Sequence, residues 1–166
     1  LKGLLFIILF LSVIAPISAY EFAGLKTEYM NAEKTNFYGF GLFTSNKRFD
    51  AEIEFFLSTK VFKGESEAKA LSDKAKLFFY SFAAYFHFIR TDSISYYIGT
   101  GIMPLLPKVY AVHATLGMDF FWGENWRVFY NFRYLYNNAS TAVNYRYPGG
   151  ATFAFGFKYT WDFIKI

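Results

Sequence analysis

The sequence predicts an all-β protein, an eight-stranded antiparallel up-and-down transmembrane β-barrel that is preceded by a signal-peptide helix. Apolar and polar residues alternate along most of the chain, and the connections between the alternating segments differ in length. Beyond the N-terminus, no apolar run reaches the ~20 residues that a membrane-spanning helix needs. A chain of 166 residues, 54% of them hydrophobic and 24% aromatic, is long enough for one such domain.

The N-terminal segment has the layout of a secretory signal peptide. Lys2 supplies a basic start, residues 3–14 are almost entirely apolar or small, and residues 15–19 read Ala-Pro-Ile-Ser-Ala, the small-residue pattern of a cleavage site. The apolar run is too short for a spanning helix. We therefore predict a signal peptide over residues 1–19 and a barrel domain over residues 20–166, with a retained N-terminal anchor as the alternative.

The alternation of the remaining chain has the period of a β-strand. Between residues 49 and 61, Ile53 and Leu57 fall on one face of an extended chain, while Glu52 and Glu54 fall on the other. Helical spacing would scatter these charges around a cylinder, whereas a strand separates the two sets. The same pattern predicts eight strands, over residues 20–30, 36–44, 49–62, 76–90, 94–103, 108–122, 126–137 and 151–163.

The predicted connections are tight at one end of the barrel and longer at the other. Tight turns are expected at residues 45–48, 91–93 and 123–125, long loops at 63–75 and 138–150, and a connection of intermediate length at 104–108. Short periplasmic turns and longer outer loops are the plan of a barrel in a bacterial outer membrane, and eight strands place both termini on the short-turn side. The first long loop is rich in Ala, Glu and Lys, which predicts a short helix over residues 65–76.

The distribution of large aromatic residues indicates that lipid surrounds the barrel. One face of successive segments carries bulky apolar side chains, and the other carries polar and small residues such as Gly39, Gly99 and Gly156. The interior of an eight-stranded barrel has little room, so 23 Phe and 14 Tyr residues cannot all lie inside it. On the outside they would be an aggregation-prone surface in water but a favourable one in a bilayer.

The three tryptophans give a separate indication of orientation. Trp122 ends the sixth predicted segment, Trp126 begins the seventh, and Trp161 lies near the end of the eighth. In an up-and-down barrel all three fall on the apolar face at the short-turn end. We therefore predict a periplasmic aromatic belt of Trp122, Trp126 and Trp161. The alternative is a β-sandwich core in which the three coincide by chance.

Charge and cysteine content exclude several classes of function. The net charge is +4, from 17 basic and 13 acidic residues. The basic residues are not clustered in any one segment, so no nucleic-acid binding is expected. The absence of cysteine excludes a disulfide framework, a thiolate metal site, a Cys nucleophile and an acylated lipoprotein anchor. Two histidines with no third ligand at a known spacing predict no metal site, and no cofactor is expected.

The polar face predicts a network of ion pairs inside the barrel. We expect a luminal charge network formed by Lys26, Glu52, Glu54, Arg133 and Lys158. Other candidates on the polar face are Glu28, Lys60, His87, His113, Asp119 and Arg127. Buried charges require partners, so these side chains would fill the lumen and neutralise one another. The alternative is a narrow, gated ion path through the same residues.

The whole mature chain resembles the small eight-stranded outer-membrane barrels of the OmpA and OmpX type. The signal peptide, the alternating segments, the loop asymmetry and the aromatic last strand carry the likeness, which is architectural. The segment 156–163 resembles the terminal strand that the barrel assembly machinery reads, but the chain continues to Ile166. The resemblance implies a monomer in contact with outer-membrane lipid and lipopolysaccharide, with a structural, envelope-stability or surface-interaction role and a largely plugged lumen.

Two other functions remain as alternatives. His113-Ala114-Thr115 resembles the His-x-Ser pair of lipid A deacylases, although Thr replaces Ser and the predicted register points His113 inward. A lipid A-modifying enzyme is therefore the first alternative to a non-enzymatic barrel. A small pore or channel is the second.

Overall fold

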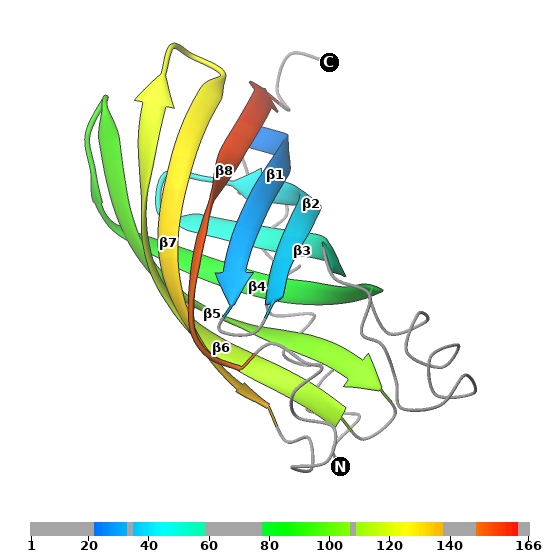
Figure 1. Ribbon diagram of the computed structural model, residues 1–166. Coiled ribbons are helices and arrows are strands. Elements are labelled where there is room, and N and C mark those ends of the chain that lie inside the picture. The colour runs from blue at the N-terminus through cyan, green and yellow to red at the C-terminus, as the bar shows by residue number, and fades with distance from the viewer. Residues whose placement is uncertain (1–21, 33–34, 59–77, 107–108, 138–148, 163–166) are drawn as a thin grey trace, which may run out of the picture.

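The computed structural model describes residues 22–32, 35–58, 78–106, 109–137 and 149–162 of the chain. The strands are β1 (Phe22–Ala32), β2 (Thr35–Ser45), β3 (Phe49–Ser58), β4 (Phe78–Arg90), β5 (Ile94–Leu106), β6 (Val109–Trp122), β7 (Trp126–Asn137) and β8 (Gly150–Asp162). Each strand pairs antiparallel with the next, and β8 pairs with β1, so the sheet closes into a barrel (Figure 1). The predicted all-β, eight-stranded, up-and-down architecture is confirmed.

The predicted strand boundaries agree closely with the observed ones. The bounds of β7 are those predicted, and the other strand ends within the described residues differ by three residues or fewer. The predictions that lie outside the described residues include the signal peptide over 1–19, the end of the third strand over 59–62, the long loop over 63–75 and the loop helix over 65–76. Among the described residues, no helix is long and apolar enough to cross a membrane.

The predicted connection at residues 104–108 is wrong in extent, because β5 continues through Pro104. The pairing of β5 with β6 shifts between Pro104 and Leu106, so the proline sits at a bulge. A bulge tolerates a residue that cannot donate a ladder hydrogen bond, which is why the strand survives there. Only residues 107–108 separate β5 from β6, and only residues 33–34 separate β1 from β2. The asymmetry of the connections therefore rests on two long segments, those between β3 and β4 and between β7 and β8.

The three tight turns lie together at one end of the barrel, hereafter the turn end. Asn46 N donates to Phe49 O at 2.9 Å, and Thr91 N donates to Ile94 O at 2.8 Å, closing two hairpins. The third turn contains Gly123, whose φ of 72° is easily adopted only by glycine. Phe22, the first residue of β1, pairs with Asp162 of β8 and lies at this end too.

Side chains alternate between the inside and the outside along most of each strand. In β7, for example, Arg127, Asn131 and Arg133 are buried inside, while Tyr130 and Tyr134 are exposed outside. The consecutive large residues of β5 alternate in the same way, because Tyr97 is buried and its neighbours Tyr96 and Ile98 are exposed.

The expectation that aromatic residues stay outside was incomplete, because several lie inside. The buried aromatic side chains are Phe37, Phe43, Phe56, Phe79, Tyr85, Tyr97 and Phe129. Five of them stand opposite a glycine on the neighbouring strand, in the pairs Phe43–Gly24, Phe56–Gly39, Tyr85–Gly99, Tyr97–Gly117 and Phe129–Gly156. A Cβ added at any of these glycines would meet the facing ring. The glycines thus make room for these rings inside the barrel.

Candidate functional site

The interior holds charged side chains from strands that are far apart in sequence, hereafter the luminal charge cluster. Lys26 lies on β1, Arg133 on β7 and Lys158 on β8, which are neighbouring strands. Glu52 and Glu54 lie on β3, which pairs with none of those three. Their contacts therefore cross the lumen. All five sequence-predicted residues are buried, and the structure brings them together.

The middle of the luminal charge cluster is organised by Lys26 and Arg133. Lys26 Nζ lies 3.1 Å from Glu28 Oε2 and 2.7 Å from Glu52 Oε2, and it also donates to Glu54. Arg133 donates to Glu54 Oε1 at 2.8 Å and to Glu28 Oε2 at 3.1 Å. Two cations thus share three buried carboxylates. Because an unpaired buried charge is costly, these groups depend on one another.

A second part of the luminal charge cluster lies nearer the turn end. Lys158 Nζ connects the two parts, because it lies 2.7 Å from Glu52 Oε1 and 3.4 Å from Asp50 Oδ2. Arg127 lies between Asp50 and Asp119, at 3.8 and 3.7 Å. Asp119 and Arg127 are among the residues predicted on the polar face, whereas Asp50 falls on the same strand face as Glu52 and Glu54 but is not among the predicted interior charges. Asp50 occupies an inward position of β3, two residues before Glu52, and that spacing was the signal available.

The cluster is close to electrically balanced. Among the described residues, four buried Lys and Arg side chains face five buried carboxylates. The cations are Lys26, Arg127, Arg133 and Lys158, and the carboxylates are Glu28, Asp50, Glu52, Glu54 and Asp119. Aromatic rings also contact the cations: Lys26 Nζ lies 4.5 Å from the centre of the Phe129 ring. Lys60, a further sequence candidate, lies outside the described residues.

A group of apolar side chains, hereafter the apolar layer, fills the interior at the end opposite the turns. Its buried members are Met30, Ala32, Phe37, Phe56, Phe79, Met103, Ala111, Leu135 and Ala154. The Phe56 and Phe79 rings stack at 5.0 Å, and the Phe37 ring meets Phe79 edge-on at 5.1 Å. The interior therefore changes from ionic to apolar along the barrel axis, a division that sequence analysis did not predict.

Both histidines lie inside the barrel, as the predicted register required for His113. His113 Nδ1 lies 2.9 Å from Thr115 Oγ1, and its Nε2 lies 3.4 Å from Ser81 Oγ. The pair that resembles a deacylase motif therefore does form a contact. However, His113 and Thr115 are both buried, so neither faces the outside of the barrel where a lipid would lie.

A second hydroxyl and histidine pair lies at the turn end. His87 Nδ1 is 2.6 Å from Ser95 Oγ, and His87 Nε2 is 3.2 Å from Asp50 Oδ1. This is the order of groups in a serine-hydrolase triad. Ser95 is 0% exposed and its hydroxyl also contacts the Ile89 carbonyl oxygen at 3.2 Å, so its oxygen is not presented to a substrate. We interpret the three residues as part of the packed interior.

One group of side chains has the composition of a metal site. Ligand atoms of Asp50, His87 and Asp119 lie within 4.8 Å of one another, and all three residues are buried. Lys158 and Arg127 already contact both carboxylates, at distances between 3.4 and 3.8 Å. A divalent cation would meet two positive charges there, so we assign no metal to this group.

The three tryptophans lie at the turn end, on the outer surface. Trp122 and Trp126 face each other across the β6–β7 hairpin and are exposed, whereas Trp161 on β8 is half-buried. Trp126 contacts the Tyr159 ring at 4.9 Å, and Tyr159 lies 6.4 Å from Trp161. The three side chains thus occupy one band of the outer surface, together with Tyr159.

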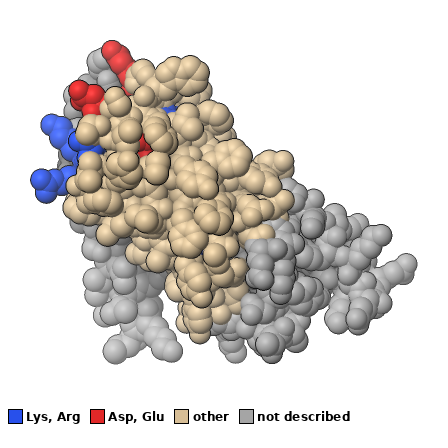
Figure 2. Space-filling model, turned by 60° about the vertical axis from the view of Figure 1, so that its left-hand side comes forward, with Lys and Arg blue, Asp and Glu red and all other residues tan. Residues whose placement is uncertain are grey.

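Between its ends, the described part of the outer wall carries no exposed charged side chain. Among the described residues, the exposed charged side chains are those of Lys47, Arg48, Asp92 and Glu124, all in the tight turns. Figure 2 shows Lys, Arg, Asp and Glu gathered at one end of the molecule, with a broad uncharged surface beside them. Exposed side chains of that surface include Leu25, Phe40, Ile98, Leu116, Tyr130 and Phe155.

The architecture is shared with solved barrel structures. The N-terminal β-barrel domain of Pseudomonas aeruginosa OprF is 10% identical and has a TM-score of 0.63, with 86% of this chain and 98% of that chain covered. A de novo designed transmembrane β-barrel is 10% identical, with a TM-score of 0.57 and coverages of 85% and 95%. Neisserial surface protein A is 10% identical, with a TM-score of 0.50 and coverages of 87% and 96%.

The likeness is one of fold. It confirms the architectural resemblance to small eight-stranded outer-membrane barrels that the sequence indicated. No family model and no curated protein matches the chain. Function must therefore be argued from the surface and the interior.

Proposed function

We propose that the chain is a non-enzymatic outer-membrane β-barrel with a structural, envelope-stability or surface-interaction role. The observation that carries the proposal is the uncharged outer wall, around which large apolar side chains are exposed on all eight strands. Such a surface far exceeds the apolar patches of soluble monomers. In a bilayer it lies against lipid, and a closed sheet leaves no unpaired backbone edge.

The proposed orientation places the turn end in the periplasm. Trp122, Trp126 and Trp161 then form an aromatic belt at the inner interface, where such rings are favourable. The long segments between β3 and β4 and between β7 and β8 leave the barrel at the opposite end. These segments, which include the predicted loops 63–75 and 138–150, would face the exterior and lipopolysaccharide. Delivery would be by the barrel assembly machinery, and the protein would be a monomer.

The proposed lumen is closed and does not conduct. The apolar layer fills one end of the interior, and the charges of the luminal charge cluster are engaged with one another rather than arranged along a path. The interior of an eight-stranded barrel is only wide enough for such side chains. Planar-bilayer recording of the purified protein should show a silent membrane. Discrete conductance steps would instead support the small-pore alternative.

The membrane proposal itself is tested by folding into lipid. The purified chain should float with phosphatidylcholine vesicles, resist added protease and migrate differently on a gel before and after boiling. Its circular dichroism should show β-structure only when lipid or detergent is present. A chain that stays soluble and monomeric without detergent would overturn the proposal.

The enzyme alternative has a separate test. We expect no fatty acid to be released when the folded barrel is incubated with lipopolysaccharide, because His113 and Thr115 are buried. His113→Ala is the matched variant. Release by the parent protein that disappears in His113→Ala would support a deacylase instead.

A further inference from the structure

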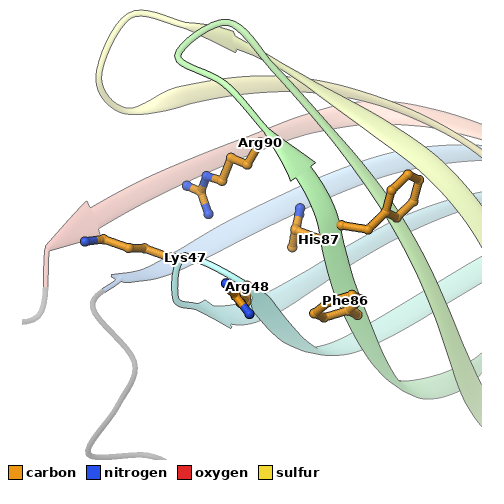
Figure 3. A pocket seen from close by; sticks show the side chains of 6 residues that line it. Lys47, Arg48, Phe86, His87 and Arg90 are labelled. Atoms are coloured by element: carbon orange, nitrogen blue, oxygen red, sulfur yellow. The ribbon is translucent and has the colours of Figure 1, made fainter.

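A pocket of about 480 Å³ opens at the turn end of the barrel. It is lined by Lys47, Arg48, Phe86, His87, Phe88 and Arg90. Figure 3 shows Lys47 and Arg48 on the β2–β3 turn and Arg90 at the end of β4, with His87 beside them on β4. The closed lumen and the uncharged outer wall do not explain why cationic side chains lie together around this pocket.

The two cations of the β2–β3 turn are available to a ligand. Lys47 and Arg48 are exposed, and among the described residues neither side chain forms an ion pair or a hydrogen bond. Their backbone is nevertheless fixed, because Asn46 Oδ1 accepts hydrogen bonds from Arg48 N at 2.8 Å and Phe49 N at 2.7 Å. A turn with a fixed backbone thus carries two cationic residues that follow each other in the sequence.

The third cation is directed into the pocket by an irregularity of β4. The pairing of β4 with β5 shifts between His87 and Ile89, so Phe88 and Ile89 are both exposed. Arg90 then stands opposite the inward-facing Ser95 instead of pointing outward. Bulges commonly re-aim a side chain in this way. Arg90 NH1 donates to Asn46 O at 2.9 Å, which holds its guanidinium beside the β2–β3 turn.

The surroundings of the pocket specify the chemistry of its occupant. Three cationic side chains favour a phosphate, which arginine binds through several hydrogen bonds at once. Phe86, Phe88 and Ile89 are exposed beside them and continue into the apolar outer wall. A ligand that satisfies both features carries a phosphate and an acyl chain. Lipopolysaccharide meets that description but, in the proposed orientation, lies at the opposite end of the barrel.

We propose that this pocket binds the headgroup phosphate of an anionic phospholipid in the periplasmic leaflet. The inference rests on the proposed function, because it needs the turn end to lie at a membrane interface. Lys47, Arg48 and Arg90 contact the phosphate, and Phe88 and Ile89 pack against the acyl chains. The bound lipid would fix the depth of the barrel in the bilayer at one point of its rim.

The test uses the whole mature chain and defined lipids. The protein is first folded into phosphatidylcholine vesicles and checked by flotation and by its migration before and after boiling. It is then extracted in mild detergent, supplied with equal amounts of phosphatidylglycerol and phosphatidylcholine, and examined by native mass spectrometry. We expect retention of phosphatidylglycerol over phosphatidylcholine, and Lys47→Gln/Arg48→Gln should lower that preference about tenfold.

A matched variant separates the pocket from general electrostatics. Adding Asp92→Asn and Glu124→Gln to Lys47→Gln/Arg48→Gln restores the net charge of the turn end without restoring the pocket. The preference should stay low in this quadruple variant, and its recovery would overturn the site. Competition by excess glycerol phosphate, which has no acyl chain, should displace little lipid. Full displacement would indicate a free-phosphate site and overturn the lipid assignment.

Failure of this inference can be distinguished from failure of the proposed function. A chain that floats and folds but shows no preference for phosphatidylglycerol has no such lipid site, while its membrane role stands. A chain that does not enter vesicles at all overturns the proposed function, and the lipid site with it.

Discussion

Arg133 is fully buried, and its guanidinium contacts the carboxylates of Glu28 and Glu54. Lys26 contacts the same two carboxylates from the neighbouring part of the wall. Neither cation can be removed without leaving negative charges close together in a place where water is scarce. Removing one partner of a buried ion pair therefore destabilises the protein by more than the intact pair contributes to its stability.

Replacing Arg133 by methionine should strongly destabilise the barrel. We expect Arg133→Met to lower the free energy of unfolding by ~3–5 kcal/mol, because Glu28 and Glu54 lose a partner. The measurement is a urea titration of protein folded into phosphatidylcholine vesicles. The double variant Arg133→Met/Glu54→Gln is the control and should recover part of the loss, since one of the unpaired charges is gone. Equal stability of Arg133→Met and the parent protein would contradict the prediction.

At the scale of the strands, the interior is shaped by glycine and aromatic residues that face each other across neighbouring strands. Gly117 faces Tyr97, and the three atoms nearest to a Cβ added at Gly117 all belong to the Tyr97 side chain. Gly156 faces Phe129, but an added Cβ there would also meet the backbone of Thr27 and Glu28. The first obstruction can be removed by changing a side chain, whereas the second cannot.

The two glycines should therefore respond differently to alanine. We expect Gly117→Ala to cost ~1–3 kcal/mol through overpacking. In a Tyr97→Ala background the same change should cost clearly less, because the two residues are coupled. Gly156→Ala is the matched comparison. In a Phe129→Ala background it should remain almost as destabilising as in the parent protein, because the backbone contacts stay. Double-mutant cycles from urea titrations measure both couplings, and equal couplings would show that this account of the inner wall is wrong.

The β6–β7 turn isolates a backbone effect from packing. Gly123 has a φ of 72°, and nothing lies within 4 Å of a Cβ added there. Gly123→Ala should therefore cost ~1–2 kcal/mol through backbone conformation alone. Gly123→Asn should cost less, because asparagine tolerates the left-handed region better. Urea titration compares the two variants, and an alanine variant no less stable than the asparagine variant would contradict the explanation.

For the molecule as a whole, the sequence predicted the barrel well because alternation reports directly on which face each residue occupies. Lys26, Glu54 and Arg133 could be placed inside from their parity along the strands. Their pairing partners could not, because those depend on how far each strand is staggered around the closed sheet. The Pro104 bulge and the His87–Ile89 bulge were likewise missed, since each inserts a residue that no periodic pattern contains.

The inner aromatic residues were missed for a different reason. The volume of each aromatic residue, taken separately, indicates that the rings belong outside, although Phe56 already falls on the face of Glu52 and Glu54 in the sequence. Phe56 and Tyr97 fit inside because Gly39 and Gly117 are their cross-strand partners. Which glycine faces which ring can be read from the sequence only when the register of the neighbouring strands is known. The apolar layer could not be predicted for the same reason, because its members come from many strands and meet only when the register is known.

The medium around the barrel can be determined by one substitution at mid-height. Leu116 is exposed on the outer wall at the centre of β6, between Ile98 and Phe132. If lipid lies there, Leu116→Arg should lower the free energy of unfolding by ~2–4 kcal/mol, because a charge at the middle of a bilayer is poorly solvated. If water lies there, an exposed substitution should change stability by only about 0.5 kcal/mol.

Tyr136, which is exposed on the outer wall near the end of β7, provides the matched control. Tyr136→Arg should cost only ~0–1 kcal/mol, because an arginine near the interface can extend its charge toward water. Both variants are compared with the parent protein by urea titration in the same vesicles. A dependence on height along the wall is expected only if a bilayer surrounds the barrel. Equal and small effects at Leu116 and Tyr136 would place water, not lipid, against the aromatic surface.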